Sequence, residues 1–316
     1  MNPDSILELM RRYQAACVLG AAAELDLFAA LAPRPLTARE AARKLRADPR
    51  ATAILLDALA ALRLLVKRGA RYAVPRDVAN SVRNALPMLQ HQANCLRRWA
   101  QLARTVRSGT KPEHKPSVRG AVGDCDSFIG AMHVINTGCA DAVVRDLKCR
   151  RLLDVGGASG TWTMVLLRAN PGATATLFDL PTVIPLARRR LAKLRSRVKF
   201  VAGDFYNDPL PGGADLVWVS AIVHQNSRAQ NRALFAKAHR ALVPGGRIAI
   251  RDIVMEPSRT APVSGALFAV NMLVGTEAGG TFTLAELRKD LEAAGFRRVR
   301  LARRDEGMNT VVVAVR

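Results

Sequence analysis

The feature that most constrains this chain is a glycine-rich turn between an apolar segment and a helical one. Residues 152–155 form a short apolar run, Gly156, Gly157 and Gly160 follow, and residues 163–168 have a helical pattern. Glycine lets the backbone turn sharply and approach a ligand closely, so such a turn is typical of nucleotide-binding folds. The G-G-x-x-G spacing is not the dinucleotide fingerprint, and alone it is also compatible with a simple turn.

Strands and helices alternate from residue 151 onward. Short apolar runs predict strands at residues 152–155, 174–178, 198–201, 216–219, 247–250, 299–301 and 310–315. Helices are predicted between them at residues 163–168, 183–194, 230–242 and 284–294. This alternation predicts an α/β fold with a parallel sheet covered by helices on both faces, in which ligands bind at the carboxyl ends of the strands.

Two carboxylates follow predicted strands beyond the glycine-rich turn. Asp179, followed by Leu180, ends the second strand, where a carboxylate can accept hydrogen bonds from a ribose diol. Asp204 lies between Gly203 and Phe205 at the end of the third strand, in position to bind an adenine amino group with the phenyl ring stacked on the base. Each aspartate alone is also compatible with a solvated turn. The three motifs in this order predict a nucleoside-type cofactor.

The N-terminal part is mostly helical. Residues 5–32 are apolar on nearly all sides of the expected helix, which indicates burial against another subunit. Thr37 and Glu40 have the spacing of a capping box, and alternating runs around Gly69 predict a β-hairpin. Three helices and a hairpin are the order of a winged helix. The helix at residues 50–65 has few side chains that could reach base edges, so we expect it to pack against protein rather than to read DNA.

The charge balance is strongly basic, with 48 Lys and Arg against 26 Asp and Glu and a net charge of +22. The charge is spread evenly along the chain, so we interpret it as an ordinary basic enzyme surface that can still attract anionic molecules.

The 5 cysteines are scattered without a C-x-x-C, which predicts neither a disulfide framework nor a metal site. The start carries Asp4 and Glu8 and the apolar run 15–23 is too short to cross a bilayer, so we expect a cytoplasmic protein.

Together these motifs resemble those of the class I S-adenosylmethionine-dependent methyltransferases. More narrowly, they resemble the caffeic acid/hydroxyneurosporene-type O-methyltransferases, which have an N-terminal winged-helix dimerisation domain. The resemblance is carried by residues 153–160, 177–181, 200–204, 214–224 and 242–246, with the helix 128–132 and the Gly295-Phe296 pair.

The resemblance implies a Rossmann-like methyltransferase sheet in residues 101–316 and a dimerisation domain in residues 1–100 that exchanges helices across a homodimer. It implies S-adenosyl-L-methionine as the cofactor and no membrane partner. The cofactor contacts that it implies are Asp154, Gly156, Gly157, Gly160, Asp179, Leu180, Gly203, Asp204, Phe205 and Ser220.

His224 closes the fourth predicted strand, where this family places its catalytic base. A phenol, with a pKa near ~10, must lose its proton to attack a methyl sulfonium well, and a neutral histidine can accept that proton at pH 7. A histidine considered by itself is more often a core or capping residue. The resemblance places Asp252 where a carboxylate orients the histidine ring.

The chain also departs from the family. Gln225 and Asn226 follow His224 where the plant enzymes have Asp-Trp, and Ser220 replaces a lysine that touches the cofactor. A second orienting carboxylate has no clear match, and Glu277 is the nearest acid.

The acceptor pocket is implied by the resemblance alone, since Met and Phe at helical spacing are also common in protein cores. The implied pocket residues are Phe128, Met132, Asn271, Met272, Met308 and Asn309. The predicted function is methyl transfer to a hydroxyl of a small, aromatic or polyketide-like molecule, with His224 as general base.

Three alternatives stay open at this point. The acceptor atom can instead be nitrogen or carbon, which would make His224 less important. A nucleic-acid methyltransferase is favoured by the net charge of +22 but opposed by an aromatic content of only 5%. A DNA-binding regulator that senses the cofactor is opposed by the apolar second helix. Salt-dependent binding to duplex DNA would distinguish these last two alternatives from a small-molecule O-methyltransferase.

Overall fold

The computed structural model describes residues 2–316 and divides the chain into two compact units. Unit 1 comprises residues 1–100 and 113–134, and unit 2 comprises residues 101–112 and 135–316. The chain therefore passes between the units more than once, whereas the sequence motifs suggested a single division near residue 100. Within the described residues, no helix is both long and apolar enough to span a bilayer.

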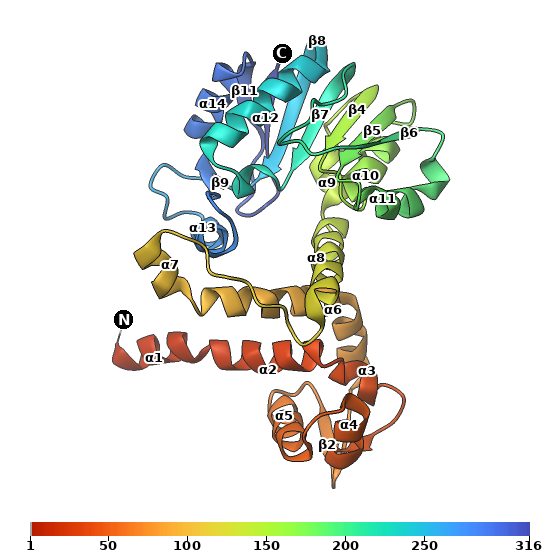
Figure 1. The fold of residues 1–316 in the computed structure, drawn as a ribbon, viewed down its shortest axis with the longest axis vertical. Helices are drawn as coiled ribbons and strands as arrows, with labels where there is room; N and C mark the ends of the chain where they lie inside the picture. Colours follow the sequence, from red (N-terminus) through yellow and green to blue (C-terminus); the bar gives the residue numbers. More distant parts are fainter. Residues whose placement is uncertain (1) are drawn as a thin grey trace. The chain divides into compact units, whose positions relative to one another are not determined.

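Unit 1 is mostly helical, with a small sheet beside α4 and α5 (Figure 1). Its helices are α1 (Pro3–Arg11), α2 (Tyr13–Glu24), α3 (Leu27–Leu31), α4 (Ala38–Leu45), α5 (Pro49–Ala61), α6 (Arg76–Trp99) and most of α8 (Gly120–Thr137). The strands β1 (Leu36–Thr37), β2 (Val66–Arg68) and β3 (Arg71–Ala73) form an antiparallel sheet in the order β1-β3-β2. The predicted hairpin is thus present, with Gly69 at a φ of +56° in its turn.

The predicted helix start in unit 1 has the expected cap. The backbone N–H of Thr37 donates to Glu40 Oε2 at 2.7 Å, and the backbone N–H of Glu40 donates to Thr37 Oγ1 at 3.2 Å. These two bonds form the capping box that the spacing predicted for α4. The core beneath it includes Leu27, Leu56 and Tyr72.

Unit 2 is centred on a 7-stranded sheet in the order β11-β12-β8-β7-β4-β5-β6. Its strands are β4 (Arg151–Val155), β5 (Thr174–Asp179), β6 (Val198–Ala202), β7 (Ala214–Ser220), β8 (Leu242–Asp252), β11 (Arg297–Arg303) and β12 (Thr310–Val315). The five strands from β6 to β8 pair in parallel, and β12 and β11 pair antiparallel at one edge. A small parallel pair, β9 (Val254–Met255) with β10 (Phe282–Thr283), lies beyond β8. This confirms the predicted Rossmann-like α/β fold.

Helices cover both faces of the large sheet and enclose two apolar cores. On one face lie α9 (Ala140–Val144), α10 (Thr161–Ala169) and α11 (Ile184–Arg190), and on the other lie α12 (Arg228–Ala241) and α14 (Leu284–Ala293). The two remaining helices of unit 2 are α7 (Leu102–Ser108) and α13 (Val263–Gly275). The two-sided covering leaves only the strand ends open for polar side chains.

Two boundaries differ from the predictions. Residues 108–124 are rich in Pro, Gly and charge, a composition that predicts a loop, but the last part of this segment lies in α8, which begins at Gly120. The predicted helix 183–194 is shorter, because α11 ends at Arg190 and a single 3-10 turn, Ala192–Leu194, follows it. Three consecutive arginines end α11, where cations near the helix C-terminus are favourable.

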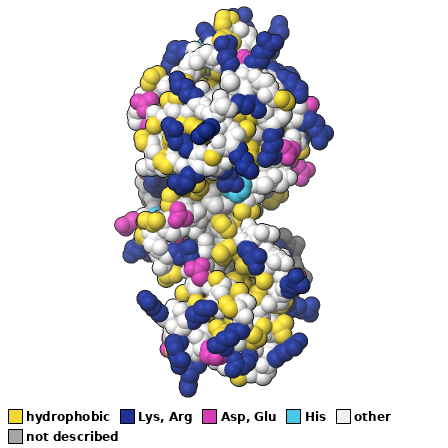
Figure 2. Space-filling view, turned by 90° about the vertical axis from the view of Figure 1, so that its right-hand side faces the viewer, with side chains coloured by type: hydrophobic (Ala, Val, Ile, Leu, Met, Phe, Trp, Pro, Cys, Tyr) yellow, Lys and Arg dark blue, Asp and Glu magenta, His cyan; other side chains and the backbone are white. Residues whose placement is uncertain are grey.

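Figure 2 shows Lys and Arg side chains spread over the visible face, with apolar and acidic side chains between them. No single basic stripe dominates this face, which agrees with the even distribution of charge along the sequence. A nucleic-acid groove requires a continuous cationic track, and this face does not present one.

Candidate active site

The glycine-rich turn joins the end of β4 to the start of α10. Gly156 and Gly160 have φ values of +65° and +78°, a region that disfavours side chains with a Cβ. A Cβ on Gly157 would lie 2.6 Å from Leu177 Cγ and 3.0 Å from Asp154 Oδ2, so this position also requires glycine for close packing. The backbone N–H of Gly156 donates to the carbonyl of Phe178 at 2.8 Å, which ties the turn to the end of β5.

Asp154 lies beneath this turn and is 1% exposed. Thr163 Oγ1, in α10, donates to Asp154 Oδ2 at 2.6 Å. Burial raises the pKa of Asp154 to about 7, against the lowering effect of the Thr163 hydrogen bond. Because the side chain is buried between β4 and α10, its observed role is to support the turn from below.

Asp179 ends β5 beside the same turn. Its Oδ2 accepts from the backbone N–H of Ala158 and its Oδ1 accepts from that of Leu180, each at 2.7 Å. Burial raises the pKa of Asp179, while these two N–H groups oppose the rise. Each carboxylate oxygen keeps a second lone pair, so the group can also accept hydrogen bonds from a diol.

The loop after β6 is held in place from several sides. Asp204 Oδ1 accepts from the backbone N–H of Tyr206 at 2.9 Å, and Asp204 Oδ2 accepts from Asn207 Nδ2 at 2.8 Å. Lys237 Nζ, from α12, donates to the carbonyl of Phe205 at 2.9 Å. The Phe205 ring lies within van der Waals reach of the Cα side of Gly156, since a Cβ there would be 3.8 Å from Phe205 Cε1. The first and third sequence motifs therefore meet, as their positions at strand ends require.

His224 is aimed by a strained turn after β7. Ala221 has a φ of +57°, and its backbone N–H donates to the carbonyl of Arg251 in β8 at 2.9 Å. A non-glycine residue in this region costs roughly 1–2 kcal/mol, and such strain often marks a functional segment. A single 3-10 turn, Val223–Gln225, follows and directs the imidazole back toward the end of β8.

The imidazole of His224 is hydrogen-bonded to a buried carboxylate. Nδ1 lies 2.9 Å from Asp252 Oδ1 and 3.0 Å from Asp252 Oδ2, and the two side chains are 11% and 4% exposed. The carboxylate also accepts from the backbone N–H groups of His224 and Ile253. An ionised carboxylate only accepts hydrogen bonds, so in a neutral imidazole paired with it Nδ1 is the donor and Nε2 keeps a lone pair.

Phe268, on α13, packs edge-on against the imidazole with ring centroids 4.8 Å apart and an interplanar angle of 89°. Asn271 follows Phe268 by one helical turn, so the two share a helix face. Met272 is the next residue and is 8% exposed. The predicted pocket residues Asn271 and Met272 thus lie on the helix that contacts His224, whereas Phe268 was missed because α13 is apolar all round and was not predicted as a helix.

Ser220, the last residue of β7, accepts a hydrogen bond from Nη1 of Arg251 at 3.2 Å. Arg251 is 1% exposed, and burial lowers its pKa. Its Nε and Nη2 donate to Asn309 Oδ1 at 3.0 and 2.7 Å. The side chain of Asn309, predicted in the acceptor pocket, therefore has its oxygen engaged by a buried arginine that the sequence reasoning did not identify.

The other predicted residues are more dispersed. Leu180 is 45% exposed, and Met308 lies half-buried next to Asn309. Glu277 pairs with Lys111 at 2.7 Å and its side chain is 81% exposed, so it does not support the His224 ring. Phe128, whose ring meets that of His91 at 5.2 Å, and Met132 belong to unit 1.

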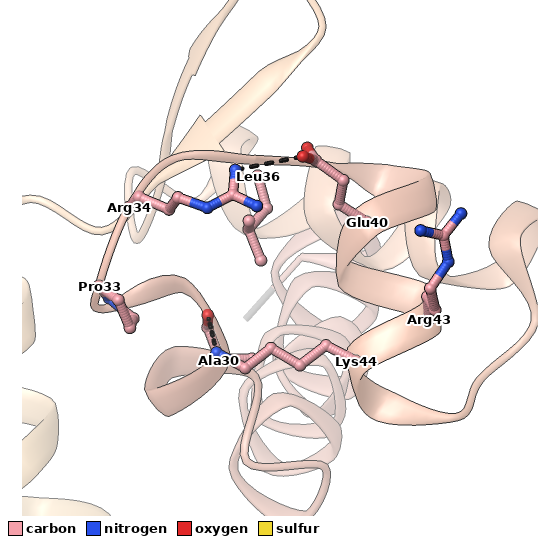
Figure 3. A pocket seen from close by; sticks show the side chains of 7 residues that line it. All are labelled: Ala30, Pro33, Arg34, Leu36, Glu40, Arg43 and Lys44. Carbon is pink, nitrogen blue, oxygen red and sulfur yellow. Dashed lines mark hydrogen bonds and ion pairs between the residues drawn. The ribbon is translucent and has the colours of Figure 1, made fainter.

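Unit 1 also has a small basic hollow of about 310 Å³ (Figure 3). Arg34 pairs there with Glu40 at 3.1 Å, and Lys44 Nζ donates to the carbonyl of Ala30 at 2.9 Å. Glu40 and Lys44, the lining groups that can act as a base or a nucleophile, are held in these contacts, and Glu40 also caps α4. Within residues 2–316, no group of three or more His, Cys, Asp or Glu side chains is placed to hold a metal ion.

Comparisons with known proteins agree with this arrangement. Residues 127–297 match the model of the O-methyltransferase domain, and residues 7–81 match that of the O-methyltransferase dimerisation domain. The tetracenomycin polyketide synthesis 8-O-methyl transferase TcmO of Streptomyces glaucescens is 32% identical, covering 95% of this chain and 93% of that protein. The 3-hydroxy-5-methyl-1-naphthoate 3-O-methyltransferase of Streptomyces sahachiroi is 34% identical, covering 94% and 91%.

A solved structure matches along the full length of the chain. Human N-acetylserotonin methyltransferase in complex with S-adenosylmethionine superposes with a TM-score of 0.81 and 25% identity, covering 100% of this chain and 98% of that one. The similarity therefore covers both units.

Proposed function

Because the chain belongs to the S-adenosylmethionine-dependent O-methyltransferases, acting on small molecules, we propose that it methylates a phenolic hydroxyl of an aromatic or polyketide-like acceptor with His224 as general base. The observation that carries the proposal is the hydrogen bond of 2.9 Å between His224 Nδ1 and Asp252. It leaves Nε2 as a proton acceptor at the end of a strand adjoining the glycine-rich turn.

The residues at the strand ends fit the cofactor. Gly156, Gly157 and Gly160 let the turn pack tightly against the side chains of Ile222, Leu177 and Leu191, and Asp179 offers lone pairs suited to a ribose diol. Asp204 and Phe205 would bind and cover the adenine, with Leu180 and Gly203 beside them. Asp154 would act by supporting the turn.

When bound, the cofactor supplies an electrophilic methyl group on a sulfonium. The protein's own part is to hold the acceptor hydroxyl in line and to remove its proton. His224 takes the proton on Nε2, and Asp252 holds the ring and stabilises the imidazolium that forms. Neither the proton transfer to His224 nor the methyl transfer from the sulfonium requires a metal ion.

The acceptor pocket includes, in this proposal, Phe268, Asn271 and Met272 of α13 together with Met308. Phe268 contributes an apolar wall beside the base, and an apolar surrounding favours a reaction in which the sulfonium charge is lost. Phe128 and Met132 of unit 1 remain proposed pocket residues on family grounds. Asn309 acts here through Arg251.

Unit 1 would serve as the homodimer interface. Its matched dimerisation domain begins at residue 7, inside α1, and no residue of α1 is buried within the chain. A helix that is stable only with its apolar side covered is expected to pair with a second copy.

The test is turnover by His224→Ala. We expect a fall of about 10²–10⁴-fold, the usual contribution of a general base, with unchanged affinity for S-adenosylhomocysteine. A panel of catechols, flavonoids and polyketide phenols would first identify an acceptor. His239→Ala is the matched control, because His239 also packs edge-on against a phenylalanine, with centroids 5.1 Å apart, and it lies in α12.

Equal turnover by His224→Ala and the wild type at neutral pH would refute the general-base role. A nitrogen or carbon acceptor, which needs less help in losing a proton, would then be the better hypothesis. Loss of activity in His239→Ala would instead show that the assay responds to general destabilisation.

A further inference from the structure

Arg251 is a buried cation without an anionic partner. It is 1% exposed, and no carboxylate within residues 2–316 forms an ion pair with it; Asp252 and Asp305 act on it only over longer range. Its contacts are Asn309, Ser220, the side chain of Cys139 and the ring of Trp162, whose centroid is 4.6 Å from Cζ, and none of these is a carboxylate. Removing a guanidinium from water costs several kcal/mol unless charge and hydrogen bonds compensate, so an unpaired one beside a ligand site requires an explanation.

The guanidinium reaches the strand ends through Ser220. Ser220 follows Val219, which pairs with Val155, the residue before Gly156, so its hydroxyl lies one strand away from the glycine-rich turn. Trp162 is in the first turn of α10, on the other side of that turn. The cation is therefore enclosed by the elements that border the proposed cofactor site, while Ser220 itself is half-buried.

The hydrogen bond from Arg251 determines what Ser220 can do. A hydroxyl has one proton to donate and two lone pairs. Arg251 Nη1 occupies one lone pair, and Ser220 donates to no other group among residues 2–316. The proton of the hydroxyl is thus available to a ligand, and the neighbouring positive charge makes it a stronger donor.

Among the charged groups of the cofactor, only one is complementary to this pair. The sulfonium and the amino group are cationic and would be repelled, while the adenosine is assigned to Asp179 and Asp204. We propose that Ser220, polarised by Arg251, is the donor that binds the methionyl carboxylate of the cofactor, with Arg251 as a positioning residue that supplies the charge. This inference rests on the proposed placement of the cofactor and adds the group that its amino-acid end meets.

The experiment compares two ligands that differ only in the carboxylate. S-adenosylhomocysteine and its decarboxylated analogue, S-adenosyl-3-thiopropylamine, are titrated by calorimetry into the wild type, Ser220→Ala, Arg251→Met and Arg251→Lys. We expect Ser220→Ala and Arg251→Met to weaken the binding of S-adenosylhomocysteine about 10- to 100-fold, the range for a charge-assisted hydrogen bond. Binding of the analogue should change less than about 3-fold, and Arg251→Lys should recover part of the discrimination.

Arg247→Met is the matched control. Arg247 lies on the same strand and the same face as Arg251, but it donates to the carbonyl of Lys148, which precedes β4. It should leave the affinities for both ligands unchanged. If Arg251→Met does not fold, Ser220→Ala carries the test alone, since it removes one hydroxyl from a half-buried site.

Two results would overturn the inference. An equal loss for both ligands would show that the pair only maintains the structure. Unchanged cofactor affinity with a raised KM for carboxylated acceptors would show that the anion belongs to the acceptor. Asp179→Ala, measured in the same series, separates this failure from a failure of the proposed function: if it too leaves both affinities unchanged, the cofactor does not bind at these strand ends.

Discussion

In unit 2 charged and amide side chains are buried at the ends of the strands, whereas in unit 1 large apolar side chains are exposed along a helix. Asp154, Arg251 and Asp252 are each at most 3% exposed. In α1, by contrast, Ile6 and Met10 are 54% and 70% exposed. Burying polar groups and exposing apolar surface both cost free energy. A ligand bound at the strand ends would offset the cost in unit 2, and a protein surface packed against α1 would offset it in unit 1.

The chemical character of each region indicates which partner it binds. Buried polar groups of opposite character at the carboxyl ends of β4 and β8, with β7 between these strands, suit a small ligand with defined polar groups. An exposed amphipathic helix suits another protein surface, and here a second copy of the chain. The predictions below separate these two functions, beginning with the largest effect.

The first prediction concerns α1. Ile6 and Met10 lie one turn apart on its apolar side. If the proposed homodimer buries them, the double variant Ile6→Ser/Met10→Ser loses about 1.5–3 kcal/mol of burial for each residue. We expect light scattering to show a dimeric mass for the wild type and a monomeric one for the variant at micromolar concentration.

Glu8→Gln, on the polar side of the same helix, should leave the mass unchanged. A monomeric wild type would contradict the proposed role of unit 1. Cofactor binding by unit 2 is expected to survive the double substitution, which would show that the two functions are separable.

The second prediction uses the buried carboxyl of Asp154, whose pKa is raised by burial to about 7. In the unfolded chain an aspartate titrates near ~3.9. Between these values the folded state keeps a proton that the unfolded state has lost, so the stability from this group is complete below pH 4 and declines as pH rises to 7.

Asp154→Asn should remove this slope, which amounts to a few kcal/mol at about 1.4 kcal/mol per pKa unit. The measurement is the difference in unfolding free energy between the wild type and the variant from pH 4 to 8. A difference that does not vary with pH would show that Asp154 is ionised in the fold throughout.

The third prediction compares two aspartates with similar local roles. Asp179 accepts backbone N–H groups at the carboxyl end of β5, and Asp215 accepts those of Arg150 and Arg151 at the opposite end of the sheet. Asp179→Ala should weaken cofactor binding by about 1–3 kcal/mol, the cost of leaving a buried polar partner unsatisfied. Asp215→Ala should not change it, and equal effects of the two substitutions would remove Asp179 from the site.

The smallest effect is expected for Asp252→Asn. The amide oxygen can still accept from one of the backbone N–H groups of His224 and Ile253, which donate to different oxygens of the carboxylate, but the amide lacks the charge that stabilises an imidazolium. Turnover should fall about 10-fold, less than for His224→Ala, while cofactor affinity stays the same. A loss as large as that of His224→Ala would mean that the ring is misplaced without the carboxylate.

The sequence predicted well those features that depend on one strand and the turn after it. Gly156, Asp179 and Asp204 each follow an apolar run, and the carboxyl ends of parallel strands share one edge, so their convergence follows from the pattern. The capping box of α4 is equally local. For His224 and Asp252 the resemblance indicated that the two side chains are partners. The structure explains why they meet: β7 and β8 pair in a register that places Ser220 opposite Arg251, so the residues after Ser220 lie close to Asp252.

What the sequence could not reveal depends on tertiary contacts. The strand around Arg251 was predicted to end at Ile250, since an arginine after an apolar run ordinarily marks the surface. Helix α13 has no polar side, so periodicity did not distinguish it, and Phe268 was missed with it. The role of Asn309 beside Arg251 likewise depends on the antiparallel pairing of β12 with β8.

The most direct measurement of the central claim is the dependence of turnover on acceptor acidity. A base is needed most by a phenol with a pKa near ~10 and hardly at all by one that is already ionised at pH 7. For a series of substituted phenolic acceptors at saturating cofactor, the ratio of wild-type to His224→Ala turnover should fall from about 10²–10⁴ toward about 1 as the phenol pKa drops below 7. A ratio that stays constant across the series would show that His224 positions the acceptor without taking its proton, and it would contradict the account.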